Sequence, residues 1–125
     1  MIEVLIPSNP KFKRYSSEAK KLYEQSQEKI GDSNSFNFIV NNTLFYLFIN
    51  NGALLGAIYY FIDNKKLYLN GFSYPKNHYA NLRSLFTSLS WFKKPIYAEA
   101  RNRASALCLL RCGFKRVEDN LFCYE

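Results

Sequence analysis

The sequence predicts an α+β domain with a central, mixed and mostly antiparallel sheet flanked by helices. Residues 43–73 hold three apolar stretches separated by an Asn-Asn-Gly turn at 50–52 and an Asp-Asn-Lys turn at 63–65, which is the pattern of an antiparallel meander. After Pro75 the apolar residues recur three and four positions apart, which is the period of an amphipathic helix. The end of the chain alternates a strand, a helix and two strands, so both element types belong to one layered domain.

The N-terminal part predicts one strand and one helix. Residues 2–6 form a short apolar strand. A helix is expected from 16 to about 30, where either serine of the Ser-Ser pair at its start can cap the first turn and Gly31 can stop it. Its few apolar positions place this helix on the surface. Residues 36–40 fit either an additional strand or an irregular connection.

The remaining elements follow from the alternation of apolar runs and turn residues along the second part of the chain. They are strands at 43–50, 53–63 and 66–73, a helix from Pro75 that is closed by Pro95, a strand at 96–100, a helix at 103–112 that stops at Gly113, and a strand pair at 114–117 and 121–124.

Length and composition fit a single domain that spans residues 1–125, because 125 residues with 48% hydrophobic content can build one core. No apolar run approaches the ~20 residues of a membrane-spanning helix. The first residues lack the basic region of a secretory signal. We therefore expect a cytoplasmic protein without a membrane partner.

The cysteine content indicates buried thiols rather than a metal site. Cys108, Cys112 and Cys123 are an odd number and lie in apolar surroundings without the spacing of metal ligands. His78 is the single histidine, so a zinc site with four ligands would have to recruit carboxylates. We expect no metal.

Basic residues are concentrated in the second half of the chain. Of the net charge of +7, residues 76–116 contribute nine basic side chains against one acid, Glu99, while the rest is close to neutral. Such one-sided charge favours an anionic partner: a phosphorylated cofactor, a nucleic acid or an acidic protein surface.

A motif near the C-terminus carries a family resemblance. The pattern is Asn-x-x-Ala-x-x-Leu-Tyr followed by Gly-Phe. Its positions are occupied here, at the same spacing, by Asn102, Ser105, Cys108, Leu109, Gly113 and Phe114. With the strand before it, this order resembles the second half of the GNAT family of acetyl-CoA-dependent N-acetyltransferases. The order of elements agrees over nearly the whole chain, although the resemblance is specific only after Lys66. It implies a GNAT-like acyl-CoA N-acyltransferase fold.

The resemblance also implies where acetyl-CoA binds as acyl donor. In the family the strand that corresponds to 66–73 and the helix after it form the site, with pantetheine along the strand edge and the pyrophosphate on the helix N-terminus. A helix N-terminus favours an anion because of its dipole and its free N–H groups. The implied cofactor-binding residues are Phe72, Ser73, His78, Asn81, Arg83, Ser84 and Asn102.

The phosphate loop departs from the family pattern. His78 stands where the family has Arg or Gln, and Asn81 and Arg83 replace its glycines. Asn81 can adopt the left-handed conformation that such a loop uses. Arg83 can contact a phosphate or fill its space. Asn102 corresponds to a residue that orients cofactor or substrate, and it can also be the N-cap of the helix that follows.

The implied reaction, attack of an amine on a thioester, needs a proton donor for the leaving thiolate. In the family this donor is commonly the tyrosine of the motif, and Leu109 occupies that position here. Leucine cannot donate a proton. Tyr97 and Tyr124, on strands expected beside the cleft, are the candidate substitutes.

The reaction also needs a base, and Glu99 is the first candidate because it is the single acid of the basic region. Strand alternation places Glu99 on the same face as Tyr97 and Arg101. Its other interpretation is an ion pair with Arg101 or Arg103. Asn70, on the strand at 66–73, can bind substrate but cannot act as a base.

Two other classes of function compete with the acyltransferase. One is a binding or structural protein that keeps the GNAT fold without catalysis, which the missing tyrosine and glycines favour. The other is a basic nucleic-acid-binding module, because the ten Tyr and eleven Phe include aromatic residues on strands that can stack bases. The charge, however, lies in the helix-rich half and the aromatic residues lie in the meander. The sequence does not specify the acceptor amine.

Overall fold

The computed structural model describes residues 2–125, apart from the side chains of Asn77 and His78. The elements in chain order are β1 (Ile2–Leu5), α1 (Phe12–Ile30), α2 (Phe36–Asn42), β2 (Leu44–Asn50), β3 (Ala53–Asp63), β4 (Lys66–Ser73), a 3-10 turn (Pro75–Asn77), α3 (His78–Leu89), β5 (Ile96–Glu99), α4 (Arg103–Arg111), β6 (Lys115–Glu118) and β7 (Leu121–Tyr124). No helix in these residues is long and apolar enough to cross a bilayer.

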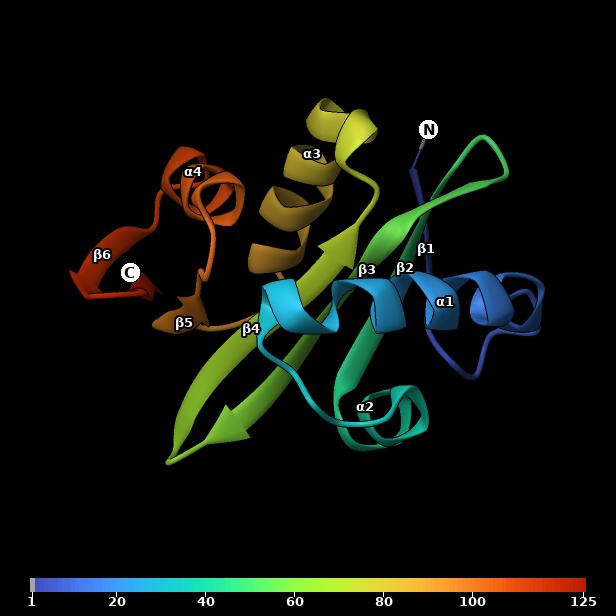
Figure 1. The fold of residues 1–125 in the computed structure, drawn as a ribbon, viewed down its shortest axis with the longest axis horizontal. Helices are drawn as coiled ribbons and strands as arrows, with labels where there is room; N and C mark the ends of the chain where they lie inside the picture. Colours follow the sequence, from blue (N-terminus) through green and yellow to red (C-terminus); the bar gives the residue numbers. More distant parts are fainter. Residues whose placement is uncertain (1) are drawn as a thin grey trace.

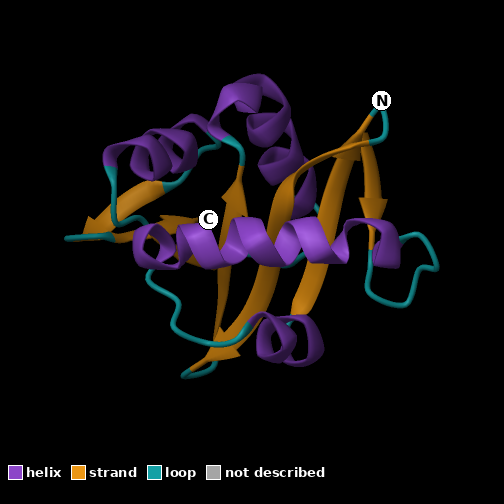
Figure 2. Ribbon diagram, turned by 45° about the vertical axis from the view of Figure 1, so that its right-hand side comes forward, coloured by secondary structure: helices purple, strands orange, loops and turns teal. Residues whose placement is uncertain are grey.

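The strands form one seven-stranded sheet in the order β1-β2-β3-β4-β5-β7-β6. β4 and β5 are the parallel pair among the described strands, and α3 makes the crossover between them. All other neighbours are antiparallel. α1 crosses one face of the sheet, and α3 lies on the opposite face (Figures 1 and 2). The predicted α+β architecture with a mixed, mostly antiparallel sheet is confirmed.

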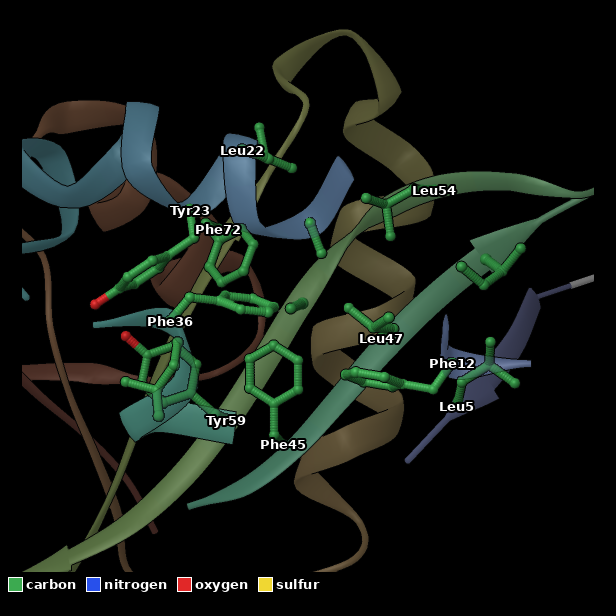
Figure 3. Close-up of a cluster of buried hydrophobic side chains, with 14 residues drawn as sticks. Leu5, Phe12, Leu22, Tyr23, Phe36, Phe45, Leu47, Leu54, Tyr59 and Phe72 are labelled. Atoms are coloured by element: carbon green, nitrogen blue, oxygen red, sulfur yellow. The ribbon is translucent and has the colours of Figure 1, made fainter. Parts of the chain in front are cut away.

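An aromatic cluster joins α1 and α2 to the sheet. Its centre is Phe45 on β2, whose ring centroid lies between 5.7 and 6.3 Å from those of four other rings: Phe12, Phe36, Tyr59 and Phe72. Figure 3 shows these side chains between the helices and the strands. Aromatic rings bury large apolar areas, and edge and tilted contacts add to that burial. This cluster therefore holds α1 in a fixed position over β3 and β4.

Two buried tyrosine hydroxyls fasten the segment between α1 and α2. Tyr59 donates to the carboxylate of Asp32 at 2.7 Å, and Tyr23 donates to the carbonyl of Asn34 at 2.7 Å. Burial, together with the Asp32 carboxylate, raises the pKa of Tyr23 to about 12, and the same two causes raise the pKa of Tyr59. Both hydroxyls therefore remain donors at neutral pH.

A second core lies on the opposite face, under α3 and α4. Leu85 and Leu89 of α3 and Leu109 of α4 are buried against the sheet. The hydroxyls of Tyr60 and Ser88 are 2.8 Å apart, and the Ser88 hydroxyl also donates to the carbonyl of Leu85. The polar atoms that this core buries are therefore hydrogen-bonded.

The start of α1 differs from the sequence-based expectation. The helix begins at Phe12 rather than at 16, and neither serine of the Ser-Ser pair caps it, because the N-cap is Lys11 and makes no side-chain cap bond. A turn in which the N–H of Phe12 donates to the carbonyl of Asn9 starts the helix. Four of its residues are buried, so α1 packs on the sheet. Gly31 ends it, as expected, with a φ of 66°.

Residues 36–42 form a helix, α2, and not the strand or irregular connection that we expected for 36–40. Ser35 is its N-cap, and the side chain of Ser35 accepts a hydrogen bond from the N–H of Phe38 at 3.1 Å. Phe36 and Ile39, three positions apart, are buried. The segment is too short for a helical period to be clear from sequence, and its stability depends on this burial.

Substitution of Gly56 by alanine is expected to lower the free energy of unfolding by about 2 to 3 kcal/mol. An added Cβ would lie 2.3 Å from the carbonyl oxygen of Phe72 and 2.7 Å from the Cα of Ser73. The control is Gly52→Ala, where nothing lies within 4 Å and only the φ of 79° opposes the change, at about 1 kcal/mol. Urea denaturation measures both, and an equal loss would contradict the close approach of β3 and β4.

Candidate functional site

The sheet divides where β4 and β5 part. Their parallel pairing runs only from Leu67 opposite Ile96 to Leu69 opposite Ala98. Beyond that point β4 stays paired with β3 as far as Ser73. β5 instead follows β7. Each half of the sheet therefore keeps its own antiparallel partner, and the two halves separate.

The separation leaves one edge of β4 open. The N–H of Tyr74 donates to the carbonyl of Leu55 on β3 at 3.1 Å. Because backbone groups point to alternate sides along a strand, those of Gly71 and Ser73 face away from β3 and toward the opening. The side-chain oxygen of Asn70 accepts from the N–H of Gly71 at 2.9 Å. The strand therefore offers main-chain groups to an extended ligand, with one of them held by its own asparagine.

A cavity of about 690 Å³ occupies the opening. Its wall comes from both halves of the sheet, from α1 on one side and from α3 and α4 on the other. This volume lies in the range of small-molecule sites. The charged side chains among its described lining residues are Lys29, Glu99 and Arg101.

Three of the predicted cofactor-binding residues line the cavity where β4 runs into α3. Ser73 is exposed at the end of β4, and the Asn81 amide donates to the carbonyl of Tyr74 at 2.9 Å. Ser84 is buried and donates to the carbonyl of Ala80. Asn81 thus closes the β4–α3 connection with a side-chain hydrogen bond, at a position where the family has glycine.

The other predicted cofactor residues differ in their placement. Phe72 lines the cavity, but its ring packs against Tyr23 under α1, with centroids 5.3 Å apart. Arg83 lies outside the lining and borders a separate hollow of about 250 Å³ between α3 and α4. The side chain of His78 lies outside the described residues.

Asn102 lines the cavity and caps α4. Its side-chain oxygen accepts from the N–H of Ser105 at 2.9 Å, in the extended conformation of an N-cap. The oxygen is therefore engaged within the protein, while the amide nitrogen is left for other interactions.

Glu99 and Arg101 form an ion pair, which was the expected alternative to a role of Glu99 as the base. The guanidinium and the carboxylate are 3.4 Å apart, and both side chains are about half exposed. Arg101 also lies against Gly31, where an added Cβ would be 2.0 Å from Nε. A cation is favourable there because the C-terminus of α1 carries partial negative charge.

The two tyrosines that were candidate proton donors do not line the cavity. Tyr97 packs against Tyr68, with ring centroids 5.7 Å apart, and lies under the ammonium of Lys66. Tyr124 packs against Phe114. The structure therefore does not bring Tyr97 or Tyr124 together with Glu99 at the opening.

Cys108 is one of the lining residues that the sequence analysis did not single out as functional. It is half-buried on α4. Interaction between the neighbouring thiols of Cys108 and Cys112 lowers the pKa of Cys108 and raises that of Cys112. The sequence signal that could have identified Cys108 is its position, because it directly precedes Leu109, which stands where the family has its tyrosine.

Among the described residues, no group of three or more His, Cys, Asp or Glu side chains could hold a metal.

The comparisons with known proteins identify the fold. No family model and no curated protein matches the chain. An N-acetyltransferase from Staphylococcus aureus Mu50 is similar with a TM-score of 0.71 and 14% identity over 100% of this chain and 97% of that one. An acetyltransferase from Streptococcus agalactiae 2603 gives a TM-score of 0.68 and 18% identity over 98% and 97%.

A GNAT family acetyltransferase from Brucella melitensis, in complex with acetyl-CoA, gives a TM-score of 0.55 and 12% identity over 98% of this chain and 86% of that one. At these identities the likeness is one of fold. The chain has the fold of GNAT acetyltransferases, as the motif at Asn102 led us to expect.

Replacement of Asn102 by alanine is expected to lower the free energy of unfolding by about 1 kcal/mol, because the N–H of Ser105 loses its partner. Asn102→Ser is the matched variant, since serine caps a helix about as well, and it should retain wild-type stability. Chemical denaturation checks both. Equal losses in the two variants would show that capping is not the source of the effect.

Alkylation with iodoacetamide is expected to modify Cys108 before the buried Cys112 and Cys123. The thiolate is the reactive form, so the lowered pKa should keep Cys108 reactive at a lower pH than an ordinary cysteine. Mass spectrometry of peptides across a pH series measures this. Cys112→Ala removes the interaction between the two thiols and should move the profile of Cys108 to higher pH. An unchanged profile would contradict the role given to Cys112.

Proposed function

We propose that this protein is a diverged GNAT N-acyltransferase that binds acetyl-CoA between β4 and β5 and transfers the acetyl group to a primary amine. The observation that carries the proposal is the end of the parallel pairing at Leu69 and Ala98, which leaves the edge of β4 open beside the cavity. The acetyl-CoA complex of the Brucella melitensis neighbour supports the choice of donor.

The chain's own groups suit the parts of acyl-CoA. Amides of an extended pantetheine can pair with the backbone groups of Gly71 and Ser73. The pyrophosphate can use backbone N–H groups at the helical start that follows β4, where the 3-10 turn at Pro75–Asn77 leads into α3. The basic residues of 76–116 add favourable charge for a phosphorylated ligand.

In the proposed reaction the amine nitrogen attacks the thioester carbonyl. The C–N bond forms, the C–S bond breaks, and its electron pair leaves on sulfur. Glu99, directly or through water, takes the proton from the amine. The thiolate takes a proton from solvent or from the thiol of Cys108, since Leu109 has none to give. Cys108 is suited to this role because it lines the cavity and its pKa is lowered.

A second candidate is a protein that binds acyl-CoA without transferring the acyl group. The observation that favours it is Leu109, buried at the position of the family's proton donor. The Asn70 side chain on the N–H of Gly71 also favours it, because that N–H is then less available to a thioester oxygen. Binding without turnover would distinguish this candidate from the enzyme.

Calorimetric titration with acetyl-CoA is expected to show saturable one-to-one binding that weakens as salt rises, because a phosphorylated ligand meets basic residues. Ser105→Trp places a large ring in the cavity and should weaken binding at least tenfold. The matched control, Leu107→Trp, carries the same ring on the exposed face of α4 and should bind as the wild type does.

Acetyl-CoA should also protect Cys108 from alkylation, and desulfo-CoA should do the same, which excludes thiol exchange as the cause. The absence of both binding heat and thermal stabilisation at millimolar acetyl-CoA would refute the acyl-CoA proposal. Salt-sensitive binding of DNA or RNA by such a protein would then favour the nucleic-acid module.

A further inference from the structure

The charged residues of the cavity wall come from two segments, the C-terminal part of α1 and the end of β5 with the residues that follow it. β4 and β5 part just after Leu69 and Ala98, and Glu99 is the next residue of β5. The amide of Asn70 donates to the carbonyl of Ile30 at 3.3 Å, which ties the end of α1 to β4 at the same level. Lys29 and Arg101 therefore reach the cavity beside Glu99.

We infer that the acceptor is a free α-amino acid, whose ammonium group binds at Glu99 and whose carboxylate binds at Arg101. This inference rests on the proposed function, because it assigns a substrate class to the same cavity. An α-amino acid carries its two charges on one carbon, so their separation resembles that of the ion pair they would replace. The ammonium group of the acceptor would replace the Arg101 guanidinium as the partner of Glu99. Its carboxylate would replace the Glu99 carboxylate as the partner of Arg101.

The ion pair between Glu99 and Arg101 is suited to such an exchange. At 3.4 Å it is long, and half exposure of both side chains means that water screens it, so an exposed pair of this kind contributes little. Arginine presents two parallel N–H groups that match a carboxylate. A ligand that offers both a cation and an anion can pair with each side chain without leaving either charge alone.

Arg101 is held in place by the end of α1. A Cβ added to Gly31 would lie 2.0 Å from the Nε of Arg101. The left-handed φ of 66° at Gly31 turns the chain at this point. The partial negative charge of the helix C-terminus favours the guanidinium. Its position over Gly31 therefore orients Arg101 before any ligand arrives.

The charge balance of the wall favours an acceptor that carries an anion. Two cations, Lys29 and Arg101, face one carboxylate among the described lining residues. The ion pairs of the described chain are Lys11 with Glu3 and Arg101 with Glu99, so Lys29 is in neither of them. A polyamine would add further positive charge, whereas a zwitterionic amino acid adds no net charge and its carboxylate can pair with a cation of the wall.

The reaction itself then favours release of the product. Glu99 takes a proton from the α-ammonium, the nitrogen bonds to the acyl carbon, and the sulfur leaves with the electron pair of the C–S bond and takes a proton as above. The N-acyl amino acid is an anion without an ammonium group, so its attraction to Glu99 is lost. Glu99 passes its proton to water and pairs again with Arg101.

The test compares amino acids with their amides, which differ only in the carboxylate. Isotope-labelled protein is titrated with five L-amino acids (alanine, leucine, phenylalanine, glutamate and lysine), with the five corresponding amides and with spermidine, followed by amide chemical shifts. At least one amino acid is expected to bind tenfold or more tightly than its amide, with the largest shifts at 29–31 and 99–102. No such preference, or tighter binding of spermidine, would overturn the inference.

Variants separate recognition from general effects of charge. Arg101→Gln should abolish the preference for the amino acid over its amide. The matched control is Arg103→Gln, which removes a cation of α4 that does not line the cavity and should keep the preference. Gly31→Ala should weaken it as well, because the new methyl group displaces Arg101 without removing its charge. A preference that survives Arg101→Gln would overturn the assignment.

The two proposals can fail separately, because the titration needs no acyl donor. It is run with and without saturating desulfo-CoA. If desulfo-CoA does not bind but the preference is found, the acyltransferase proposal fails and the amino-acid site stands. If desulfo-CoA binds and the preference is absent, the acceptor assignment fails alone.

Discussion

The candidate site depends on a difference in length between two strand pairings. The antiparallel ladder of β3 and β4 continues to Ser73, whereas the parallel pairing of β4 with β5 ends at Leu69 and Ala98. Antiparallel pairs are somewhat more stable per residue, and each half of the sheet keeps such a partner. The opening between the halves therefore leaves the backbone of β4 unpaired on one side only. That single free edge, with helices on both sides of it, gives the cavity its shape.

The aromatic cluster around Phe45 gives this opening a wall on the α1 side. Rings from α1, α2 and three strands converge there, and the hydroxyls of Tyr23 and Tyr59 secure the segment that follows α1. The C-terminus of α1 is thus placed beside Arg101 by the packing of the cluster and by the two hydrogen bonds to Asp32 and Asn34. Stability and site geometry share the same side chains, so the load of aromatic residues has a structural role and needs no base-stacking function.

Much of the architecture could be predicted from the sequence, because strand pairing and helix stops depend on local patterns. The meander, the helix after Pro75 and the stop at Gly31 follow from turn residues and apolar spacing. The start of α1 and the whole of α2 could not be predicted, since they depend on the burial of Phe12 and Phe36 in a cluster assembled from distant parts of the chain.

The candidate site could be predicted only in part, for the same physical reason. Residues that follow a local motif, such as Asn81, Ser84 and Asn102, do line the cavity. Tyr97 and Tyr124 were expected beside the cleft because of the strands that carry them, but a strand alone gives no distance between a hydroxyl and the opening. The place of Cys108 in the cavity wall follows from how α4 packs on the sheet, which no local pattern in the sequence gives.

The contact between Gly31 and Arg101 joins two segments that are seventy positions apart in the sequence. A side chain at position 31 and a guanidinium from position 101 compete for one volume. Among related chains the two positions should therefore change together: a residue other than glycine after α1 would accompany a shorter residue after β5. Such paired changes would be accompanied by a different charge beside Glu99, so this contact would be a place where related chains come to bind different ligands.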